Sequence, residues 1–572
     1  MSAVAELEPP QSHSLDAHPI VPMTLVDRYL LEQQELTAVE QFVQRHETRE
    51  LPLQARYYTS LLPAEPPGPD EQYAFEVDLD ACSGCKACVT ACNSLNGLDE
   101  SETWREVGLL YGGSDEQPFL QHVTAACHHC LDPACLNVCP VRAYEKSETT
   151  GIVRHLDDQC IGCQYCILAC PYDVPKYNRA RGIVRKCDMC SNRLAIGEAP
   201  ACVQSCPNGA IRITTVSRQE AAENCETGAF LSGAPDPQHT QPTTHYKTNR
   251  VFPRNTLPAD YYSFRPEHAH WPLVLMLVLT QLSVGAFLIE LLLENFLGNP
   301  ALRGIRSVHA GGALLFGLVA LAASTLHLGR PHLAFRAVIG LRTSWLSREI
   351  FAFGLFAFLA ILYSGSVWLS EPVAPATATI QKVLGLGVVG TGFLGIVCSI
   401  MIYQCTRRAL WNGTGTSVRF LLTTLVLGLS TALFTTLVGA DCTAPGAADS
   451  VVGGYAELLF PALVIAAVLK LLFEASLFVH LRSKQNTPLK RSALLLTGDL
   501  AGAAKWRFAL GIAGGILLPA LWLWLIRGSA DGLFLHVVIV GQFAMLLGGE
   551  LLERYLFFTA VVASRMPGGL RT

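Results

Sequence analysis

The chain has 572 residues, of which 50% are hydrophobic and 16% are charged, and its formal net charge is −5. This length favours several structural units over a single core. The weak negative charge gives no reason to expect a nucleic-acid-binding protein. Apolar residues are unevenly spread, because residues 1–265 are polar and rich in Cys, Pro and Gly, whereas Leu, Val, Ala, Gly and Phe predominate from Trp271 onward. The pattern predicts a soluble part followed by a membrane part.

Residues 1–70 are expected to form an N-terminal extension. It begins MSAVAELEPPQSHSLDAHP, which has no basic region, no apolar stretch and no twin Arg, and we therefore see no export signal. Within residues 24–46, apolar side chains at near-helical spacing predict one amphipathic helix; they are Leu31, Leu36, Val39 and Val43. This helix would pack on the following domain or dock on a partner.

Cysteine spacing is the strongest signal in the soluble part, where 17 of the 20 cysteines lie before residue 226. Sixteen of them form four groups, which are Cys82, Cys85, Cys88, Cys92; Cys127, Cys130, Cys135, Cys139; Cys160, Cys163, Cys166, Cys170; and Cys187, Cys190, Cys202, Cys206. The first and third groups have the C-x2-C-x2-C-x3-C spacing of bacterial ferredoxins, in which three thiolates bind one cluster and the fourth reaches its neighbour. Four groups therefore predict four [4Fe–4S] clusters, which would carry single electrons.

Zinc sites and disulfides are the alternatives for these cysteines. A zinc ribbon uses two separated C-x2-C pairs and has no place for a third Cys two residues further on. Cysteines separated by two residues seldom form structural disulfides. Cys225 lies outside every group and is expected to be a free thiol. His128 and His129 lie inside the second group, where we expect them to support the cluster or lie at the surface rather than bind iron.

The four motifs occur in a characteristic order within residues 71–215: ACSGCKACVTACN, ACHHCLDPACLNVCP, DQCIGCQYCILACPYDVPKY and RKCDMCSNRLAIGEAPACVQSCPNGAI. This segment resembles the iron–sulfur subunit of the DMSO reductase family of molybdoenzymes. The resemblance implies an α+β ferredoxin-like domain in which motifs one and four form one pair and motifs two and three form the other. Spacing alone does not establish that pairing.

The resemblance also implies which cysteines share a cluster. The four sets are Cys82, Cys85, Cys88, Cys206; Cys187, Cys190, Cys202, Cys92; Cys127, Cys130, Cys135, Cys170; and Cys160, Cys163, Cys166, Cys139. Respiratory nitrate reductase relatives have a Trp at the position of Cys163 and hold a three-iron cluster there. Because Cys163 is present, we expect four-iron clusters throughout. Residues 216–265 are rich in Pro, Thr and Asn and are expected to form an extended linker.

Residues 266–565 are expected to form an all-α bundle of eight transmembrane helices. A span needs about 20 mainly apolar residues. Eight stretches meet this requirement, at 272–293, 308–328, 349–370, 383–403, 418–440, 456–479, 507–527 and 533–559. A single stretch of this kind is also typical of a buried core helix, but eight in succession favour a multi-pass protein of the inner membrane.

Basic residues predict the orientation of the bundle. Fifteen Lys and Arg lie on the same side of the membrane as the cluster domain. They are Arg330, Arg336, Arg342, Arg348, Arg407, Arg408, Arg419, Arg482, Lys484, Lys490, Arg491, Lys505, Arg507, Arg565 and Arg571. Four lie on the opposite side, which are Arg303, Arg306, Lys382 and Arg527. The bias predicts that the cluster domain faces the cytoplasm. A periplasmic face is the alternative, because well-known relatives are exported with a partner.

The membrane part resembles the membrane anchor subunit of DMSO reductase. The matching stretches are HWPLVLMLVLTQLSVGAFL, STLHLGRPHLAFRA, SWLSREI and GGELLERYLFF. The resemblance implies oxidation of a quinol, with menaquinol as the expected species, and no haem. The chain also differs from the family pattern, because two subunits that are usually separate chains are fused here.

Quinol oxidation releases two protons and two electrons, so a proton acceptor must lie beside the ring. His327, at the end of the second span, and Glu349, at the start of the third, lie at the membrane edge nearest the clusters and match the quinol site of the anchor family. The alternative is structural, with His327 bonded to a backbone carbonyl and Glu349 paired with Arg348 or Arg330.

Charged residues inside the spans are costly and therefore informative. Lys470 and Glu474 are four residues apart and are expected to pair. Glu550, Glu553 and Arg554 form a second internal group, for which pairing within the bundle is preferred over a proton exit at Glu550. The histidines show no facing pair of haem ligands.

The leading hypothesis is a redox subunit that oxidises quinol and passes electrons through four [4Fe–4S] clusters to a molybdopterin-containing catalytic subunit in another chain. The same row of clusters could run in reverse, from a molybdoenzyme that oxidises sulfur compounds or formate into quinone. A hypothesis of another class is a redox sensor or assembly factor without turnover. Each of the first two places the terminal substrate site outside this chain.

Overall fold

The computed structural model describes residues 23–48, 53–100, 102–297, 303–369, 375–443, 448–525 and 532–568. The chain divides into two compact units, Met1–Ser60 and Leu61–Thr572. The first unit contains the helices α1 (Leu25–Gln34) and α2 (Ala38–Glu47) and the short 3-10 helix η1 (Leu53–Tyr57), and the 3-10 helix η2 (Thr59–Leu61) spans its boundary with the second.

The N-terminal segment forms two helices, so the single helix expected over residues 24–46 is wrong. Each helix begins at a threonine in a capping box. The backbone N–H of Glu40 donates to the Thr37 hydroxyl at 3.2 Å, and the Glu40 carboxylate accepts the Thr37 N–H at 2.8 Å. Reciprocal bonds of this kind satisfy the free donors of a helix start, so Thr37 begins a new helix where apolar spacing alone suggested continuity. The apolar side chains of both helices are exposed.

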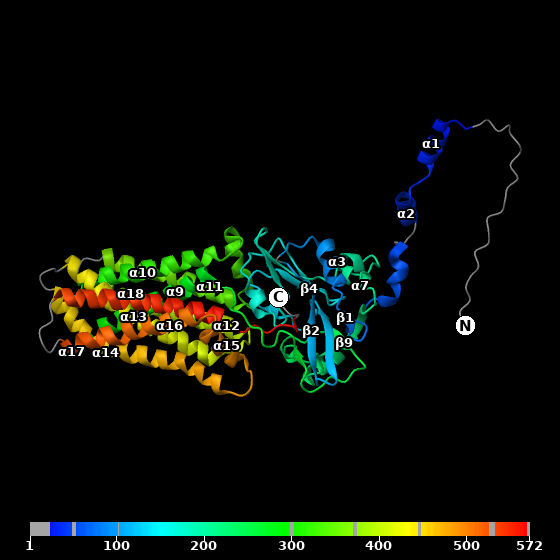
Figure 1. Ribbon diagram of the computed structural model, residues 1–572. Helices are drawn as coiled ribbons and strands as arrows, with labels where there is room; N and C mark the ends of the chain where they lie inside the picture. Colours follow the sequence, from blue (N-terminus) through cyan, green and yellow to red (C-terminus); the bar gives the residue numbers. More distant parts are fainter. Residues whose placement is uncertain are drawn as a thin grey trace. The chain divides into compact units, whose positions relative to one another are not determined.

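The cluster domain is built from two three-stranded sheets and two hairpins (Figure 1). The first sheet has the order β8-β1-β9 and the second the order β10-β2-β3. The strands are β1 (Glu71–Asp78), β2 (Glu106–Gly113), β3 (Pro118–Ala125), β4 (Tyr144–Lys146), β5 (Val153–His155), β6 (Lys176–Asn178), β7 (Ile183–Arg185), β8 (Ile211–Ser217), β9 (His245–Lys247) and β10 (Leu257–Pro258). The helices are α3 (Ala87–Asn96), α4 (Ala134–Asn137), α5 (Tyr165–Ala169), α6 (Ser191–Leu194), α7 (Ala201–Gln204), α8 (Arg218–Glu226) and η3 (Pro237–His239). This architecture confirms the ferredoxin-like α+β fold.

Strand pairing determines which cysteine groups meet. Strand β1 precedes the first group and pairs antiparallel with β8, which follows the fourth group. Strands β4 and β5 join the end of the second group to the start of the third, also antiparallel. Neighbouring antiparallel strands lie about 5 Å apart, so groups one and four share one end of the domain and groups two and three share the other.

The segment expected to be a linker, residues 216–265, also completes both sheets. Strand β9 pairs parallel with β1, with Glu76 opposite His245, and β10 pairs antiparallel with β2, with Leu257 opposite Tyr111. Backbone pairing to two separate sheets fixes the path of this segment before it enters the first membrane helix.

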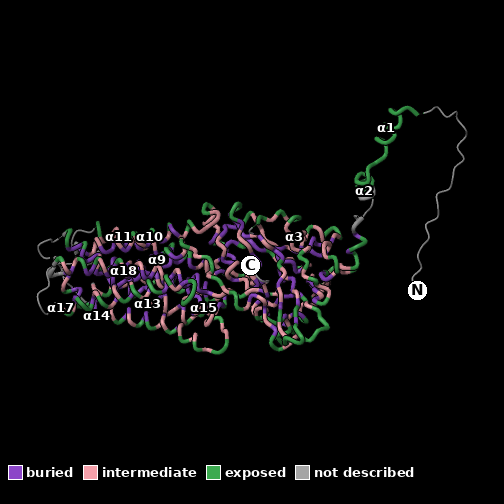
Figure 2. The backbone as a smooth tube through the Cα atoms, viewed as in Figure 1, coloured by how far each residue is buried: buried purple, intermediate pink, exposed green. Residues whose placement is uncertain are grey.

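The membrane part is a bundle of long helices that adjoins the cluster domain (Figures 1 and 2). Its helices are α9 (Trp271–Leu297), α10 (Arg303–Leu326), η5 (Pro331–Gly340), α11 (Trp345–Leu369), α12 (Pro375–Gln404), η6 (Ala409–Trp411), α13 (Gly413–Thr443), α14 (Ala448–Ala475), η7 (Ser476–Arg482), α15 (Pro488–Thr497), α16 (Ala501–Ile512), the π-helical turn η8 (Ala513–Leu517), α17 (Leu518–Leu525) and α18 (Gly532–Thr559). In the described residues, eight helical segments are long and apolar enough to cross a membrane, which confirms the eight expected spans.

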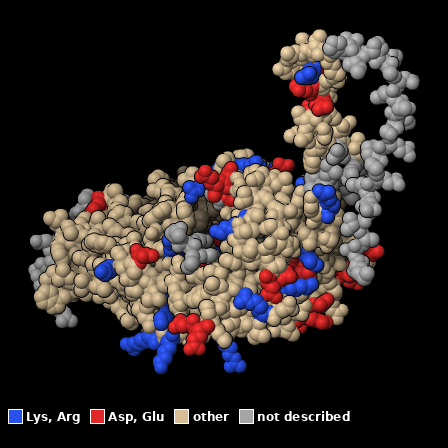
Figure 3. All heavy atoms as spheres, turned by 45° about the vertical axis from the view of Figure 1, so that its right-hand side comes forward, with Lys and Arg blue, Asp and Glu red and all other residues tan. Residues whose placement is uncertain are grey.

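Two hydrophobic cores run through the bundle. One is formed mainly by α9 to α12 and extends to Tyr165 in the cluster domain, and the other by α9, α13, α14 and α18. Helices α9 and α13 pack closely because Gly285 faces Gly428, where an added Cβ would meet backbone at 2.6 Å. Small residues permit such close approach between membrane helices. On the face drawn in Figure 3, charged side chains gather over the cluster domain and its junction with the bundle, while the bundle surface is largely uncharged.

Candidate functional site

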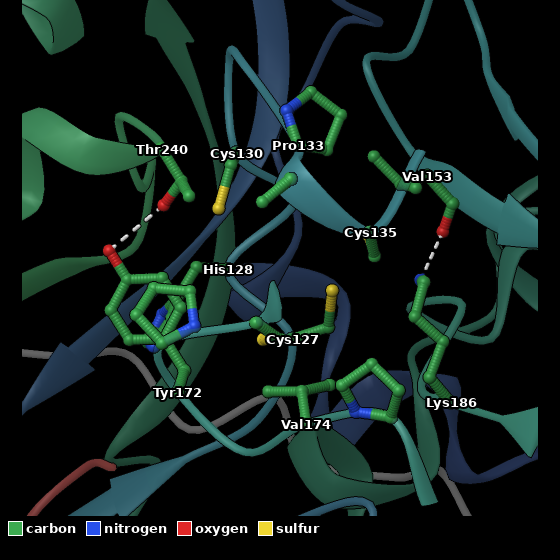
Figure 4. A pocket seen from close by; sticks show the side chains of 14 residues that line it. Cys127, His128, Cys130, Pro133, Cys135, Val153, Tyr172, Val174, Lys186 and Thr240 are labelled. Atoms are coloured by element: carbon green, nitrogen blue, oxygen red, sulfur yellow. Dashed lines mark hydrogen bonds between the residues drawn. The ribbon is translucent and has the colours of Figure 1, made fainter. Parts of the chain in front are cut away.

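Two of the four expected cysteine sets each line a cavity in the cluster domain. One cavity is lined by Cys82, Cys85, Cys88 and Cys206. The other is lined by Cys127, Cys130, Cys135 and Cys170, with Tyr172, Thr240 and Lys186 around it (Figure 4). In both, three cysteines come from one group and the fourth comes from the paired group, which is the 3 + 1 arrangement that the resemblance implied.

The remaining two sets are also brought together. Burial raises the pKa of the Cys92 thiol to about 12, and the nearby thiols of Cys202 and Cys190 add to the shift. Burial likewise raises the pKa of Cys163, with Cys139 and Cys160 as its thiol neighbours. Thiols with raised pKa values are protonated at neutral pH, and iron binding would release those protons because the thiolate is the ligand.

The backbone of the first and third groups is wound in the same way. Gly84 and Lys86 have φ of 73° and 62°, and Gly162 and Gln164 have φ of 70° and 60°. These left-handed residues turn backbone N–H groups towards sulfur. The N–H of Gly162 donates to Cys160 Sγ at 3.4 Å, and the N–H of Ala143 donates to Cys139 Sγ at 3.2 Å. Such bonds stabilise negative charge on the ligand sulfurs of iron–sulfur clusters.

The donor set fits a multinuclear iron cluster. All cysteines among the sixteen are free thiols rather than disulfides. In the part of the chain that the structure describes, no three Cys, His, Asp or Glu side chains lie close enough together to hold a single metal ion. Four soft thiolates arranged around a volume suit [4Fe–4S] chemistry.

The other cysteine and histidines of this domain have structural partners. Cys225 is a buried free thiol that donates to the Pro242 carbonyl at 3.6 Å. His128 Nδ1 lies 2.8 Å from the Thr244 hydroxyl, and His129 Nδ1 accepts the Val153 N–H at 3.0 Å. Both histidines are buried rather than placed at the surface, and His128 lines the cavity of the second cysteine set.

The third cysteine group is docked on the membrane anchor by backbone contact. Gly162, Gly182 and Gly329 lie so close that a Cβ on Gly162 would come within 2.9 Å of Gly329 Cα. The Arg330 N–H donates to the Ile161 carbonyl at 3.1 Å, and the Tyr165 hydroxyl donates to the Ile402 carbonyl at 3.0 Å. The cluster set that contains Cys163 is therefore the one adjacent to the membrane.

His327 lies directly against this docked group. Its Nε2 is 3.2 Å from the Cys163 carbonyl, and because a carbonyl only accepts, Nε2 carries the proton and Nδ1 is left as an acceptor. The His327 ring packs edge-on against the His270 ring at a centroid distance of 5.0 Å. Burial lowers the pKa of both rings, that of His270 to about 4 with help from His327 and His268. Both imidazoles are thus neutral near pH 7.

A cavity of about 920 Å³ opens beside His327 at the junction of the cluster domain and the bundle. Its lining includes His270, Trp271, Pro272, Arg408 and Phe558. Sequence reasoning missed these residues, although the HWP run immediately before the first span lies at the same membrane edge as His327. It also missed Gly329, two residues after His327, because its role depends on contacts with a distant part of the chain.

Glu349 lies near the same cysteine group but outside the lining of this cavity. It is 4% exposed, in the first turns of α11, and its carboxylate accepts a hydrogen bond from the Ser399 hydroxyl of α12. Arg348, its expected partner in the structural alternative, instead donates to the carbonyls of Leu341 and Arg342 at 3.1 and 2.9 Å. The Glu349 carboxylate interacts electrostatically with Tyr165.

The two expected groups of intramembrane charges form one buried network. Its members come from α13, α14, α16 and α18, and they are Arg419, Lys470, Glu474, Arg507, Glu550, Glu553 and Arg554. Lys470 Nζ lies 3.5 Å from Glu474 and 3.0 Å from Glu550, which confirms the first expected pair and links it to the second group. Arg507 bridges the same two carboxylates at 2.8 and 2.9 Å. Pairing offsets the high cost of placing these charges among apolar helices.

Comparison with known proteins agrees with both halves of this architecture. Residues 119–216 match the family described as a 4Fe-4S dicluster domain. Residues 267–560, just over half of the chain, match the family described as DMSO reductase anchor subunit (DmsC). The chain therefore belongs to the DMSO reductase anchor subunit family.

The cluster half of this fused anchor protein is similar to separate iron–sulfur proteins. It is 37% identical over 187 residues to "Probable anaerobic dimethyl sulfoxide reductase chain YnfG" of Escherichia coli K12, which covers 31% of this chain and 89% of that protein. It is 35% identical over 189 residues to a protein of Haemophilus influenzae that is named as part of an anaerobic dimethyl sulfoxide reductase, covering 32% and 91%. The "Formate dehydrogenase-O iron-sulfur subunit" of E. coli K12 is 33% identical over 190 residues, covering 29% and 63%. The fusion expected from sequence is confirmed.

Replacing Gly329 by Ala is expected to separate the third cysteine group from the anchor, because the new Cβ would overlap the Gly182 carbonyl. Electron transfer from quinol to the clusters should slow by about tenfold or more, while the iron content stays that of the wild type. The control is Gly354→Ala in α11, where a Cβ meets nothing within 4 Å. Equal quinol oxidation rates in the two variants would show that this contact does not position the site.

Proposed function

We propose that this fused anchor protein oxidises quinol at the membrane edge and passes the electrons through four [4Fe–4S] clusters to a molybdopterin-containing catalytic subunit. Membership of the anchor family and the fused dicluster domain support this role. The similar proteins named as parts of dimethyl sulfoxide reductase support a partner of that type. Menaquinol is the quinol that the family resemblance favours. The boundaries 71–215 and 266–565 remain our proposal for the cluster domain and the anchor.

The observation that carries the proposal is the contact between His327 and the Cys163 carbonyl at 3.2 Å. The contact supports the proposal because it brings an imidazole of the anchor, with Nδ1 left as an acceptor, against the backbone of a cysteine of the membrane-adjacent set. Quinol oxidation needs both in one place, because the protons and the electrons leave the same molecule. The adjoining cavity of about 920 Å³ is large enough for a quinol ring and part of its tail.

The residues of the site divide the chemistry between them. A [4Fe–4S] cluster held by Cys139, Cys160, Cys163 and Cys166 would accept electrons one at a time. His327 Nδ1 accepts a proton from the quinol hydroxyl. The His327 Nε2–H donates to the Cys163 carbonyl, and this bond orients the imidazole ring. Glu349, which is buried outside the cavity lining and accepts a hydrogen bond from Ser399, is the second proton acceptor in this proposal.

The reverse direction is the second candidate function. Similarity of the cluster half to a formate dehydrogenase iron–sulfur subunit favours it, since such a subunit would deliver electrons into quinone. The same residues would then donate protons to the quinone instead of accepting them from the quinol. The quinol-site geometry argues against a sensor or assembly factor without turnover.

We propose that the cluster domain faces the cytoplasm. Arg419 and Arg507, counted among the basic residues of that side, lie in the buried ion network and carry no orientation signal. The other basic residues of that side still outnumber those of the opposite side. Cys442, exposed at the end of α13 on the opposite side, provides the test. A membrane-impermeant thiol reagent should label Cys442 in intact cells, and labelling only after cell lysis would place the clusters in the periplasm.

His327→Ala and Glu349→Gln are each expected to slow quinol oxidation by about 10²-fold, in the range for loss of a general base. Steady-state quinol oxidation by membranes that contain the complete complex is the measurement. The controls are His332→Ala and Glu457→Gln, which remove exposed side chains of the same types. Rates like those of the controls, or loss of the cluster signals in either variant, would contradict the assignment of these residues.

A further inference from the structure

Two basic side chains are buried inside the cluster domain. Among the described residues of 61–265, Arg105 is 2% exposed and Lys186 is 3% exposed, and the other Lys and Arg are at least partly exposed. A buried charge is strongly destabilising unless an opposite charge lies close to it. Each of these cations therefore needs an anion.

Among the described residues, no protein carboxylate forms a salt bridge with either cation. Asp188 interacts electrostatically with Lys186, but it is partly exposed and its carboxylate accepts hydrogen bonds from the Cys190 N–H and the Ser191 hydroxyl. The described carboxylates that are buried in this domain pair with other bases. Glu102 pairs with Arg185 at 3.0 Å, and Glu76 pairs with Lys247 at 2.6 Å. Asp260, the third, pairs with Arg565 of the C-terminal segment at 2.9 Å.

The hydrogen bonds of the two cations go to neutral groups. Lys186 Nζ donates to the carbonyls of Val153 and, at 2.7 Å, Cys187. Arg105 Nη1 donates to the Thr124 hydroxyl at 3.1 Å, and its guanidinium lies 4.6 Å from the centre of the Phe75 ring. Arg105 Nη2 is buried and has no hydrogen-bond partner in the described structure.

Both cations lie between cysteine sets. Lys186 lines the cavity of Cys127, Cys130, Cys135 and Cys170, as Figure 4 shows, and binds the backbone of Cys187, which belongs to the next set. Thr124, which holds Arg105, lines the cavity of the Cys82 set, and its hydroxyl is 3.7 Å from Cys88 Sγ. Arg105 also interacts electrostatically with Cys202 and Cys92 of the set that Lys186 touches.

We propose that Arg105 and Lys186 are positioning charges that set the reduction potentials of the three clusters beyond the membrane-adjacent one. The inference rests on the proposed function, because it needs four [4Fe–4S] clusters. Each reduction adds one negative charge to a thiolate-bound cluster. A cation held in a dry interior stabilises that added charge more than it would in water, so the reduction potential rises.

The membrane-adjacent set lacks such a charge. No buried Lys or Arg among the described residues lines Cys139, Cys160, Cys163 and Cys166. His155, beside Cys160, is bonded to Asp157 at 2.8 Å, so any positive charge on it is offset. Arg330 is only half-buried and donates to a backbone carbonyl at 2.9 Å.

The test is an anaerobic redox titration of the purified full-length protein, followed by the EPR signals of the reduced clusters. The variants are Arg105→Gln and Lys186→Met. At a fixed ambient potential, the ratio of reduced to oxidised cluster should fall about tenfold for the flanking clusters, which corresponds to 59 mV for one electron. Arg105→Lys keeps the positive charge, so its ratio of reduced to oxidised cluster should equal that of the wild type. Lys247→Met removes an exposed, paired charge from the same domain and should change nothing.

Iron content separates the possible outcomes. Full iron content with unchanged potentials in both neutral variants would overturn the inference and leave the proposed function standing. Fewer than four clusters in the wild type would overturn the proposed function itself. If one neutral variant loses its clusters, the cluster potentials of the other neutral variant decide whether the inference stands. If both lose them, retention of clusters at wild-type potentials by Arg105→Lys supports the inference, and their loss contradicts it.

Discussion

The backbones of Gly329, Gly162 and Gly182 lie in close contact, and this contact determines how the cluster domain meets the anchor. No side chain fits between these backbones, so the loop that presents Cys160 and Cys163 is pressed directly onto the anchor. The Cys163 carbonyl then reaches His327, and Tyr165 reaches the end of α12. Main-chain contact therefore brings the His327 imidazole and the Cys163 loop together and leaves little freedom for the distance between them to vary. Fusion of the two halves into one polypeptide keeps them in a fixed one-to-one ratio.

Buried charge is handled differently in the two halves. Inside the bundle, four cations and three carboxylates bind one another across α13, α14, α16 and α18, so the apolar helices enclose a nearly neutral network. Inside the cluster domain, no carboxylate among the described residues pairs with Arg105 or Lys186, and thiolate-bound clusters are the anions in reach. In the bundle, the protein's own side chains balance the buried charges. In the cluster domain, the charge balance depends on its cofactors.

Local patterns were predictable from sequence, and long-range contacts were not. Cysteine spacing, the eight apolar spans and the membrane-edge positions of His327 and Glu349 follow from residues close together in the chain. The family resemblance implied the pairing of groups one with four and two with three. Its physical cause, the antiparallel pairing of β1 with β8, joins segments from opposite ends of the cluster domain's sequence. The capping box at Thr37 was readable and was overlooked, since apolar spacing alone suggested one helix. The cavity beside His270, and the placement of Glu349 outside it, depend on how α9, α11 and the cluster domain pack.

Quinol should reduce the clusters of the purified protein without any catalytic subunit. The protein is kept anaerobic in detergent, mixed with a naphthoquinol and then examined by EPR. We expect the quinol to reduce at least one [4Fe–4S] cluster, and dithionite afterwards to reduce the rest, to four in all. If all clusters accept electrons from dithionite while an excess of quinol reduces none of them, the anchor does not pass electrons from quinol to the clusters.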